Sequence, residues 1–367
     1  MPPGTAPEWA GAFRALPRAL FLPATIWPFD GVARPAVSRA DDPTGWLAAA
    51  GSDAAVVTQW DDGRHTGPAP GRTPTSSASA PPLVARMLAA LDAAPGDRVL
   101  EIGTGTGWNA ALLSHRLGDD AVTTVEVDPL VAAHARDALR RAGLVPRLVT
   151  GDGARGVPEG APYDRLIATC GMRHVPGAWI EQTRPGGVLL LPWGTPYSRR
   201  DALLRITVDE DGRATGRFLQ QVEFMKLRAD RHPLPAYPDG LPMTDRESDA
   251  WPPADDWHPF VFAAGLLLAD AAHAVERHPD GLTQWLYDLR GTGWTAAVRR
   301  DGAGPGVWVR QAGGRALWDE LTAAYGWWTR HGRPGVERFG VTVERGGAVA
   351  VWLDEAAQVV VPVMSPR

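Results

Sequence analysis

The stretch that decides the fold reads Arg98-Val-Leu-Glu-Ile-Gly-Thr-Gly-Thr-Gly-Trp-Asn109. Its apolar residues Val99, Leu100 and Ile102 predict a buried parallel strand. A turn of three glycines follows, at Gly103, Gly105 and Gly107. A helix is expected over 109–117, starting where the glycines let the backbone approach a ligand. The stretch therefore predicts a strand, a ligand-binding turn and a helix in direct succession.

A second short apolar run, 122–125, ends at Glu126, nineteen positions after Gly107. An acidic side chain at that place can accept hydrogen bonds from both hydroxyls of a ribose. Dinucleotide enzymes prefer the spacing G-x-G-x-x-G, which seats a pyrophosphate on the helix N-terminus. Here the spacing is Gly103-x-Gly105-x-Gly107 instead. The pattern indicates a nucleoside-type cofactor.

Glu101 and the glycines after it resemble motif I of class I S-adenosylmethionine methyltransferases. The resemblance implies S-adenosylmethionine (SAM) as cofactor and an α/β, Rossmann-like doubly wound parallel sheet. Further strands are expected over 147–150, 163–169 and 188–192, which suits that fold. The cofactor-binding residues implied are Glu101, Gly103, Thr104, Gly105, Gly107, Asn109, Glu126, Val127, Asp152, Gly153 and Thr169.

Composition narrows the function further. The chain has 367 residues, a formal net charge of −5 and 44% hydrophobic residues, so no basic surplus recruits nucleic acid. Cys170 is the single cysteine, which excludes an intrachain disulfide and a cysteine-based metal cluster. No metal is expected. The start of the chain lacks signal-peptide features, and the longest apolar run, 260–269, is too short to span a bilayer. We expect a cytoplasmic protein without a membrane partner.

Four segments are expected along the chain. Residues 1–87 form an N-terminal segment and the entry to the acceptor site, with one short helix over 9–18. Residues 88–228 form the methyltransferase core, and 229–256 a linker or lid. Residues 257–367 form an additional α+β domain that could recognise a peptide. In that domain we expect helices over 260–276 and 316–329 and strands over 294–298, 306–310, 339–345 and 348–353.

A family resemblance rests on residues outside the glycine-rich turn. Upstream stands Ser76-Ser-Ala-Ser-Ala-Pro-Pro-Leu-Val-Ala-Arg-Met87, and further back Ala15-Leu-Pro-Arg-Ala-Leu-Phe-Leu-Pro23. Glu159-Gly-Ala-Pro-Tyr-Asp-Arg165 and the residues 182–187 and 222–225 fit as well. Over about residues 10–228 the chain resembles protein-L-isoaspartyl O-methyltransferases. The resemblance implies SAM-dependent methyl-ester formation on a carboxylate within a peptide chain.

That chemistry needs few catalytic groups. A carboxylate is already a nucleophile at pH 7, so alignment matters more than a general base or a metal. Ser79 is expected to hydrogen-bond the acceptor carboxylate or the substrate backbone, with an ordinary helix N-cap as the alternative role. Other residues expected to contact the substrate are Trp60, Ser77, Ala78, Pro81 and Val84.

Two features depart from the family members that repair isoaspartate. Those enzymes usually carry a compact segment ending in Gly-x-Gly-Gln-Thr-Ile-Ser, whereas here the segment 56–79 is longer and Ser76-Ser-Ala78 replaces Gln-Thr-Ile. A tail of about 140 residues also follows Leu227. Both features resemble an actinobacterial subgroup found with ribosomally made, post-translationally modified peptides of the lanthipeptide, graspetide or lasso classes.

The subgroup resemblance implies methylation of an Asp in a constrained ribosomal peptide, which would be the partner of this chain. The ester then cyclises to an aspartimide, which persists or hydrolyses to isoaspartate. Tryptophans of the tail could clamp the peptide or form the tail's own core. Three alternatives stay open: general isoaspartate repair, another methyltransferase, and a non-catalytic peptide-binding scaffold. The acceptor that is methylated, and SAM binding itself, distinguish them. The oligomeric state stays open too.

Overall fold

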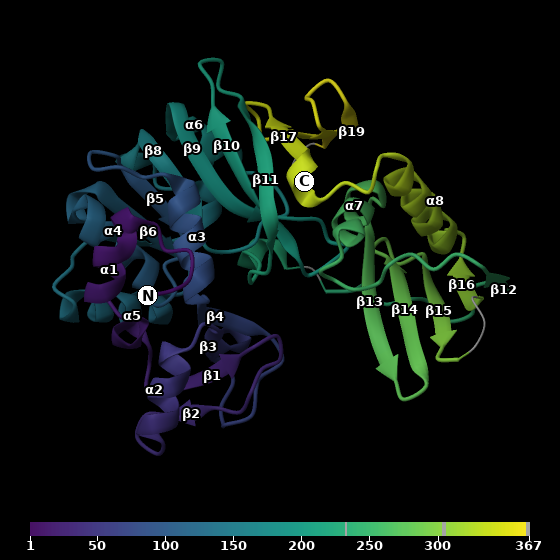
Figure 1. The fold of residues 1–367 in the computed structure, drawn as a ribbon, viewed down its shortest axis with the longest axis horizontal. Helices are drawn as coiled ribbons and strands as arrows, with labels where there is room; N and C mark the ends of the chain where they lie inside the picture. Colours follow the sequence, from purple (N-terminus) through teal and green to yellow (C-terminus); the bar gives the residue numbers. More distant parts are fainter. Residues whose placement is uncertain (232, 303–305, 365–367) are drawn as a thin grey trace. The chain divides into compact units, whose positions relative to one another are not determined.

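The computed structural model of the chain describes residues 1–231, 233–302 and 306–364 (Figure 1). The chain divides into two compact units. The first unit comprises Met1–Cys170, Pro176–Leu191 and Arg205–Ala214, and the second comprises Gly171–Val175, Pro192–Leu204 and the described residues from Thr215 onward. Three strands contribute residues to both units: β9 (Thr183–Trp193), β10 (Asp201–Val208) and β11 (Ala214–Val222).

A parallel sheet forms the centre of the first unit. Its strands lie in the order β9-β8-β5-β6-β7, with β5 in the middle. Leu100 of β5 is paired with Thr123 of β6 on one side and with Leu166 of β8 on the other. All residues of β5 and β6 are buried, as a sheet covered on both faces requires. The other four strands of this sheet are β5 (Val99–Ile102), β6 (Val122–Glu126), β7 (Arg147–Thr150) and β8 (Tyr163–Ala168).

Helices alternate with these strands along the chain, so the doubly wound fold expected from the sequence is confirmed. They are α3 (Pro81–Leu91), α4 (Trp108–Leu117), α5 (Pro129–Arg141) and the short α6 (Gly177–Glu181). Gly107 forms the N-cap of α4 with φ of 85°, a conformation that favours glycine. Asp128 caps α5 by accepting hydrogen bonds from the backbone of Leu130 and Val131.

The N-terminal part of the first unit contains a second, antiparallel sheet. Its strands lie in the order β2-β1-β3-β4 (Figure 1). The elements are α1 (Ala10–Ala15), α2 (Pro43–Gly51), β1 (Thr25–Phe29), β2 (Val37–Ser38), β3 (Ala55–Trp60) and β4 (Pro74–Ala78). The expectation of a single short helix here was wrong. Short strands among Pro, Gly and Ser give little periodicity, and this sheet depends on a shared core that includes Ile26, Trp46 and Val56.

The second unit is built around a five-stranded antiparallel sheet in the order β12-β16-β15-β14-β13. Helix α8 (Leu317–Arg330) contacts β14, β15 and β16, and it buries Trp318, Leu321 and Trp328. The strands are β12 (Met243–Ser248), β13 (Ala271–His278), β14 (Gly281–Asp288), β15 (Gly293–Arg300) and β16 (Val307–Gly313). Three further strands, β17 (Phe339–Val343), β18 (Val349–Leu353) and β19 (Val359–Met364), lie in the order β19-β18-β17-β11.

The helix expected over 260–276 is wrong in its second half. Helix α7 spans Pro259–Leu267, and the chain then continues as β13. Asp270 lies between them with φ of 52°, which interrupts a helix. The apolar residues at the start of β13 directly follow the apolar run of α7, so the sequence pattern alone extends the helix over them. Strand β12 likewise lies within 229–256, where it pairs with β16 from Met243↔Ala312 to Ser248↔Val307.

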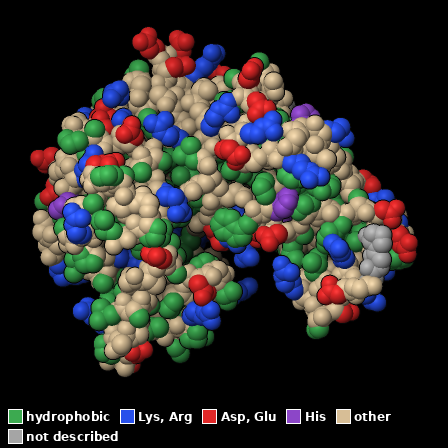
Figure 2. Space-filling model, in the orientation of Figure 1, with side chains coloured by type: hydrophobic (Ala, Val, Ile, Leu, Met, Phe, Trp, Pro, Cys, Tyr) green, Lys and Arg blue, Asp and Glu red, His purple; other side chains and the backbone are tan. Residues whose placement is uncertain are grey.

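Surface charge is mixed. On the face drawn in Figure 2, Lys and Arg side chains are interspersed with Asp and Glu, as a formal net charge of −5 suggests. Among the described residues, no helix has the length and apolar character that crossing a bilayer requires.

Candidate cofactor and acceptor site

Four predicted site residues lie at the carboxyl ends of neighbouring parallel strands. Glu101 is in β5, Glu126 ends β6, Asp152 follows β7 and Thr169 follows β8. The spatial order β8-β5-β6-β7 brings these strand ends to one edge of the sheet. The chain winds outward from β5 through β6 and β7 and then returns to the other side at β8. Such a topological switch point is where open α/β sheets bind ligands.

The glycine-rich turn is anchored beside this switch point. The backbone N–H groups of Gly103 and Thr104 donate to the carbonyl of Val125, at 2.9 and 3.2 Å. Gly103 has φ of 91°, and a Cβ there would lie 2.9 Å from Oγ1 of Thr169. That hydroxyl donates to the carbonyl of Gly103 at 2.5 Å. Any side chain at position 103 would therefore displace Thr169 and strain the turn.

Glu101 is a fully buried carboxyl beneath the turn. Asn109 Nδ2 donates to its Oε1 at 2.8 Å, and Thr124 Oγ1 donates to its Oε2 at 2.6 Å. Burial raises the pKa of Glu101 to about 7; these two hydrogen bonds oppose the increase, and the charge of Glu126 adds to it. A cationic group bound at the turn would favour the ionised carboxylate.

Glu126 faces the turn from the end of β6. Its Oε2 accepts from the N–H of Gly105 at 2.9 Å, and its Oε1 accepts from the N–H of Asp128 at 3.1 Å. Each carboxylate oxygen has a further lone pair, so the group can still accept from two ligand hydroxyls. Val127, the next residue, is exposed.

Asp152 and Gly153 shape the turn after β7. Asp152 is exposed, and its Oδ1 accepts from the N–H of Ala154 at 3.0 Å. The carbonyl of Gly153 accepts from Nε1 of Trp179 at 2.8 Å. A Cβ on Gly153 would lie 2.6 Å from Cγ2 of Ile102. Gly153 thus serves close packing on β5, and Asp152 leaves a carboxylate oxygen open to a ligand.

The predicted acceptor segment lies against the glycine-rich turn. The carbonyl oxygen of Ser77, in β4, is 3.4 Å from where a Cβ on Gly105 would stand. The side chains of Ser77 and Ser79 are half-buried, while those of Trp60, Ala78, Pro81 and Val84 are buried. The two serines are therefore the partly accessible members of this set, and the other four predicted contacts lie in the packed interior.

The N-cap role considered for Ser79 is wrong. The N-cap of α3 is Ala80, and no side chain caps this helix start. The backbone of Ser79 is instead held by Arg18, whose Nη1 donates to its carbonyl at 3.1 Å. The Ser79 hydroxyl is therefore not used for capping.

Arg18 was not identified from the sequence. It is 3% exposed, and burial lowers its pKa to about 10. Its guanidinium donates to five carbonyl oxygens, those of Ala49, Ala50, Ser52, Ala54 and Ser79. These bonds join the end of α2 and the residues just before β3 to the acceptor segment. A single arginine within the apolar run 16–22 was the only available signal.

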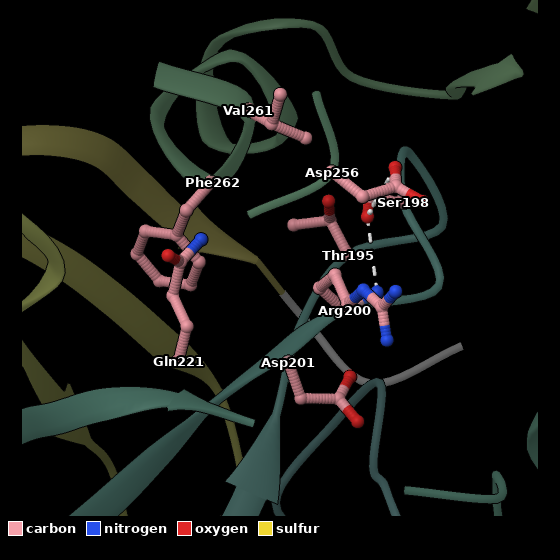
Figure 3. A pocket seen from close by; sticks show the side chains of 8 residues that line it. All are labelled: Thr195, Ser198, Arg200, Asp201, Gln221, Asp256, Val261 and Phe262. Atoms are coloured by element: carbon pink, nitrogen blue, oxygen red, sulfur yellow. Dashed lines mark hydrogen bonds between the residues drawn. The ribbon is translucent and has the colours of Figure 1, made fainter. Parts of the chain in front are cut away.

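A pocket in the second unit is a separate feature (Figure 3). It contains about 260 Å³ of empty space, a figure that includes open solvent. Asp201 in its wall is fully buried, 2.5 Å from Lys226 Nζ and 3.6 Å from Arg173 Nη1. Burial raises the pKa of Asp201, and the two cations oppose that increase. Its lining is Thr195, Ser198, Arg200, Asp201, Gln221, Asp256, Val261 and Phe262.

The fold and this strand-end site define a class I SAM-dependent methyltransferase. Residues 71–232 match the family described as Protein-L-isoaspartate(D-aspartate) O-methyltransferase. The protein-L-isoaspartate O-methyltransferase of Pyrococcus abyssi is 40% identical over 150 residues, which cover 41% of this chain and 68% of that protein. That of Pyrococcus horikoshii is 42% identical over 135 residues, or 36% of this chain and 60% of that protein. The chain belongs to the protein-L-isoaspartate O-methyltransferase family.

The sequence similarity covers only part of this chain and part of each relative. The chain spans about 60% of the length of the Pyrococcus horikoshii protein. A solved structure named protein-L-isoaspartate O-methyltransferase has a TM-score of 0.54 and 24% identity, and the match covers 96% of both chains. At that identity it shows the fold alone. The match extends over most of the residues after Leu227.

Proposed function

We propose that the protein is a SAM-dependent O-methyltransferase that esterifies a carboxylate of a peptide, with isoaspartyl residues as the acceptor. The observation that carries the proposal is the approach of Ser77 to Gly105: the Ser77 carbonyl oxygen lies 3.4 Å from the place that a Cβ on Gly105 would occupy. This approach supports assigning the segment around Ser77 to the acceptor, next to the turn that would hold the cofactor. Membership of the family supports the same activity.

The residues present fit SAM. When bound, the cofactor supplies a methyl group on a positively charged sulfur. Glu126 would hold the ribose hydroxyls, and Asp152 would lie on the adenine side. The glycine-rich turn would accommodate the methionine part, with the buried Glu101 carboxyl favouring its cationic groups. Three carboxyl groups on adjacent strand ends accept hydrogen bonds from hydroxyls and attract cations, and they would repel a pyrophosphate.

The acceptor needs orientation more than activation. An isoaspartyl carboxylate is ionised at pH 7 and attacks the methyl group without a general base. In-line placement and exclusion of water are what the protein must supply. We assign the Ser79 hydroxyl to donate a hydrogen bond to the acceptor carboxylate, with Ser77 contributing backbone contacts. Arg18 holds the Ser79 backbone in place and is a positioning residue.

A second candidate acceptor is an Asp side chain in a constrained ribosomal peptide. One observation favours it: the segment before Ser79 is a hairpin of β3 and β4 joined by the loop 61–73. The loop is ordered by Asp61, whose carboxylate accepts from the N–H groups of Arg72 and Thr73 at 3.1 and 2.8 Å. An ordered hairpin of this kind is suited to bind a peptide that is itself conformationally constrained. Attack of the next backbone amide nitrogen on the ester would expel methanol and form the aspartimide.

Mass spectrometry of three peptides incubated with the protein and SAM tests the proposal. They are a linear isoaspartyl peptide, its Asp isomer, and a macrocyclic peptide carrying Asp. A methyl ester on the isoaspartyl peptide alone supports the first acceptor. Loss of water from the macrocyclic peptide alone, through ester and imide, supports the second. Absence of any change in all three contradicts carboxyl methyl transfer to peptides.

A further inference from the structure

We propose that Gln59 is a positioning residue that couples the acceptor hairpin to the cofactor turn. The inference rests on the proposed methyl transfer, and it concerns how the two binding regions of that site influence each other. A continuous chain of hydrogen bonds, here called the relay, runs through Thr75, Gln59, Asp128, Glu126 and Gly105.

Each step of the relay is a hydrogen bond of ordinary length, between 2.7 and 3.1 Å. Thr75 Oγ1 donates to Gln59 Oε1 at 2.7 Å, and Gln59 Nε2 donates to Asp128 Oδ2 at 3.0 Å. The N–H of Asp128 then donates to Glu126 Oε1 at 3.1 Å, and the N–H of Gly105 donates to Glu126 Oε2 at 2.9 Å. The carboxylate assigned to the ribose hydroxyls is thus held from both sides.

Chemistry fixes the orientation of the Gln59 amide. An ionised Asp128 only accepts hydrogen bonds, so Nε2 of Gln59 must face it. Oε1 of Gln59 must then face the Thr75 hydroxyl. The other oxygen of Asp128, Oδ1, already accepts from the N–H groups of Leu130 and Val131 at 2.9 and 3.2 Å. Asp128 is therefore anchored on α5, and Gln59 is the group that links it to the hairpin.

The backbone at Gln59 gives an independent reason to assign it a special role. Pairing between β3 and β4 shifts register on both sides of this residue, between Val57 and Gln59 and between Gln59 and Trp60. Such irregularities in a ladder turn a side chain away from its regular direction. The regular pairing of β3 with β4 is therefore interrupted at Gln59, the residue whose side chain donates to Asp128.

The relay makes cofactor and acceptor binding interdependent. A ligand on Glu126 restrains Asp128 and Gln59, and through Thr75 it restrains the strand that leads to Ser77 and Ser79. Coupling of this kind is reciprocal: the acceptor must tighten cofactor binding by the same factor. A relay of packed polar groups can carry a factor of about three to ten.

Calorimetry on the full chain tests this directly. The dissociation constant of S-adenosylhomocysteine, which has no methyl group to transfer, is measured with and without a saturating isoaspartyl peptide. We expect the peptide to tighten binding about three- to tenfold in the wild type and not at all in Gln59→Leu. Thr75→Val should lose the coupling too, and Thr75→Ser should retain it.

Thr58→Val is the matched control. Thr58 Oγ1 donates to Ser76 Oγ at 3.0 Å, so it bridges the same two strands without reaching Asp128. This variant should keep the coupling. Thermal unfolding identifies variants that have lost the fold, and Thr75→Val replaces Gln59→Leu if the latter unfolds.

The outcomes separate the relay from the proposed activity. A wild type that methylates the isoaspartyl peptide, while folded Gln59→Leu or Thr75→Val keeps the full coupling, overturns the relay alone. Loss of coupling in Thr58→Val to the same extent also overturns it, because hairpin stability would then be the cause. A wild type without activity on the peptide contradicts the proposed function instead.

Discussion

Asn109 Nδ2 lies 2.8 Å from Oε1 of Glu101, so the first turn of α4 donates to a carboxyl that is fully buried in β5. This contact joins the strand before the glycine-rich turn to the helix after it. The turn is therefore held at both ends by one side-chain pair. Its geometry depends on a group whose charge burial disfavours, since burial raises the pKa of Glu101 to about 7.

The raised pKa of Glu101 makes stability depend on pH in the absence of cofactor. A carboxyl whose pKa is higher in the folded than in the unfolded state stabilises the fold most below its unfolded value, near 4.5. That contribution, about 3 kcal/mol, is lost as pH rises through about 7. Urea unfolding from pH 5 to 8 should show the decline, and Glu101→Gln should flatten it. An equal slope in both proteins would show that Glu101 is not responsible.

Glu126→Ala should weaken SAM binding. The change removes two charge-assisted hydrogen bonds to the ribose, about 2–4 kcal/mol of binding free energy. Calorimetry measures the affinity, and Glu181→Ala supplies a control at an exposed acid of α6. Unchanged affinity in Glu126→Ala would show that β6 does not carry the ribose site.

Ser79→Ala should lower turnover by about tenfold and leave SAM affinity unchanged, because one hydrogen bond to the acceptor is lost. The unfolding midpoint should stay near that of the wild type, since the hydroxyl does not cap α3. Steady-state kinetics on an isoaspartyl peptide measures the effect. Full activity would remove Ser79 from the acceptor site.

Arg18→Leu should destabilise the first unit by about 3–5 kcal/mol, because buried carbonyl groups lose their charged donor. The same change at Arg14, an exposed arginine four residues earlier in α1, should have little effect. Chemical unfolding compares the two variants. Equal stabilities would mean that water replaces the guanidinium at the five carbonyls.

The sequence predicted the parts of the fold whose signals are local. Strand, glycine turn, helix and the acid at Glu126 lie within thirty residues, and together with the strand signals that follow them they predict a doubly wound sheet. Helix α8 was also predicted, because its apolar residues repeat at helical spacing. These features need no knowledge of distant contacts.

The features that the sequence did not predict depend mainly on contacts between residues far apart in the chain. Gln59 and Asp128 are 69 positions apart, and neither residue type signals the other. Arg18 binds carbonyl oxygens from residues 49 to 79, which no local pattern encodes. The end of α7 was missed for a related reason: a buried helix and a partly buried strand follow each other with only residues 268–270 between them.

Methyl-ester formation on an isoaspartyl peptide, compared with its Asp isomer, is the most direct test of the central claim. We expect the wild type to add one methyl group to the isoaspartyl peptide in the presence of SAM, and Glu126→Ala to add far less at the same cofactor concentration. No ester on either isomer, and none on a macrocyclic Asp peptide, would contradict peptide carboxyl methylation by this protein.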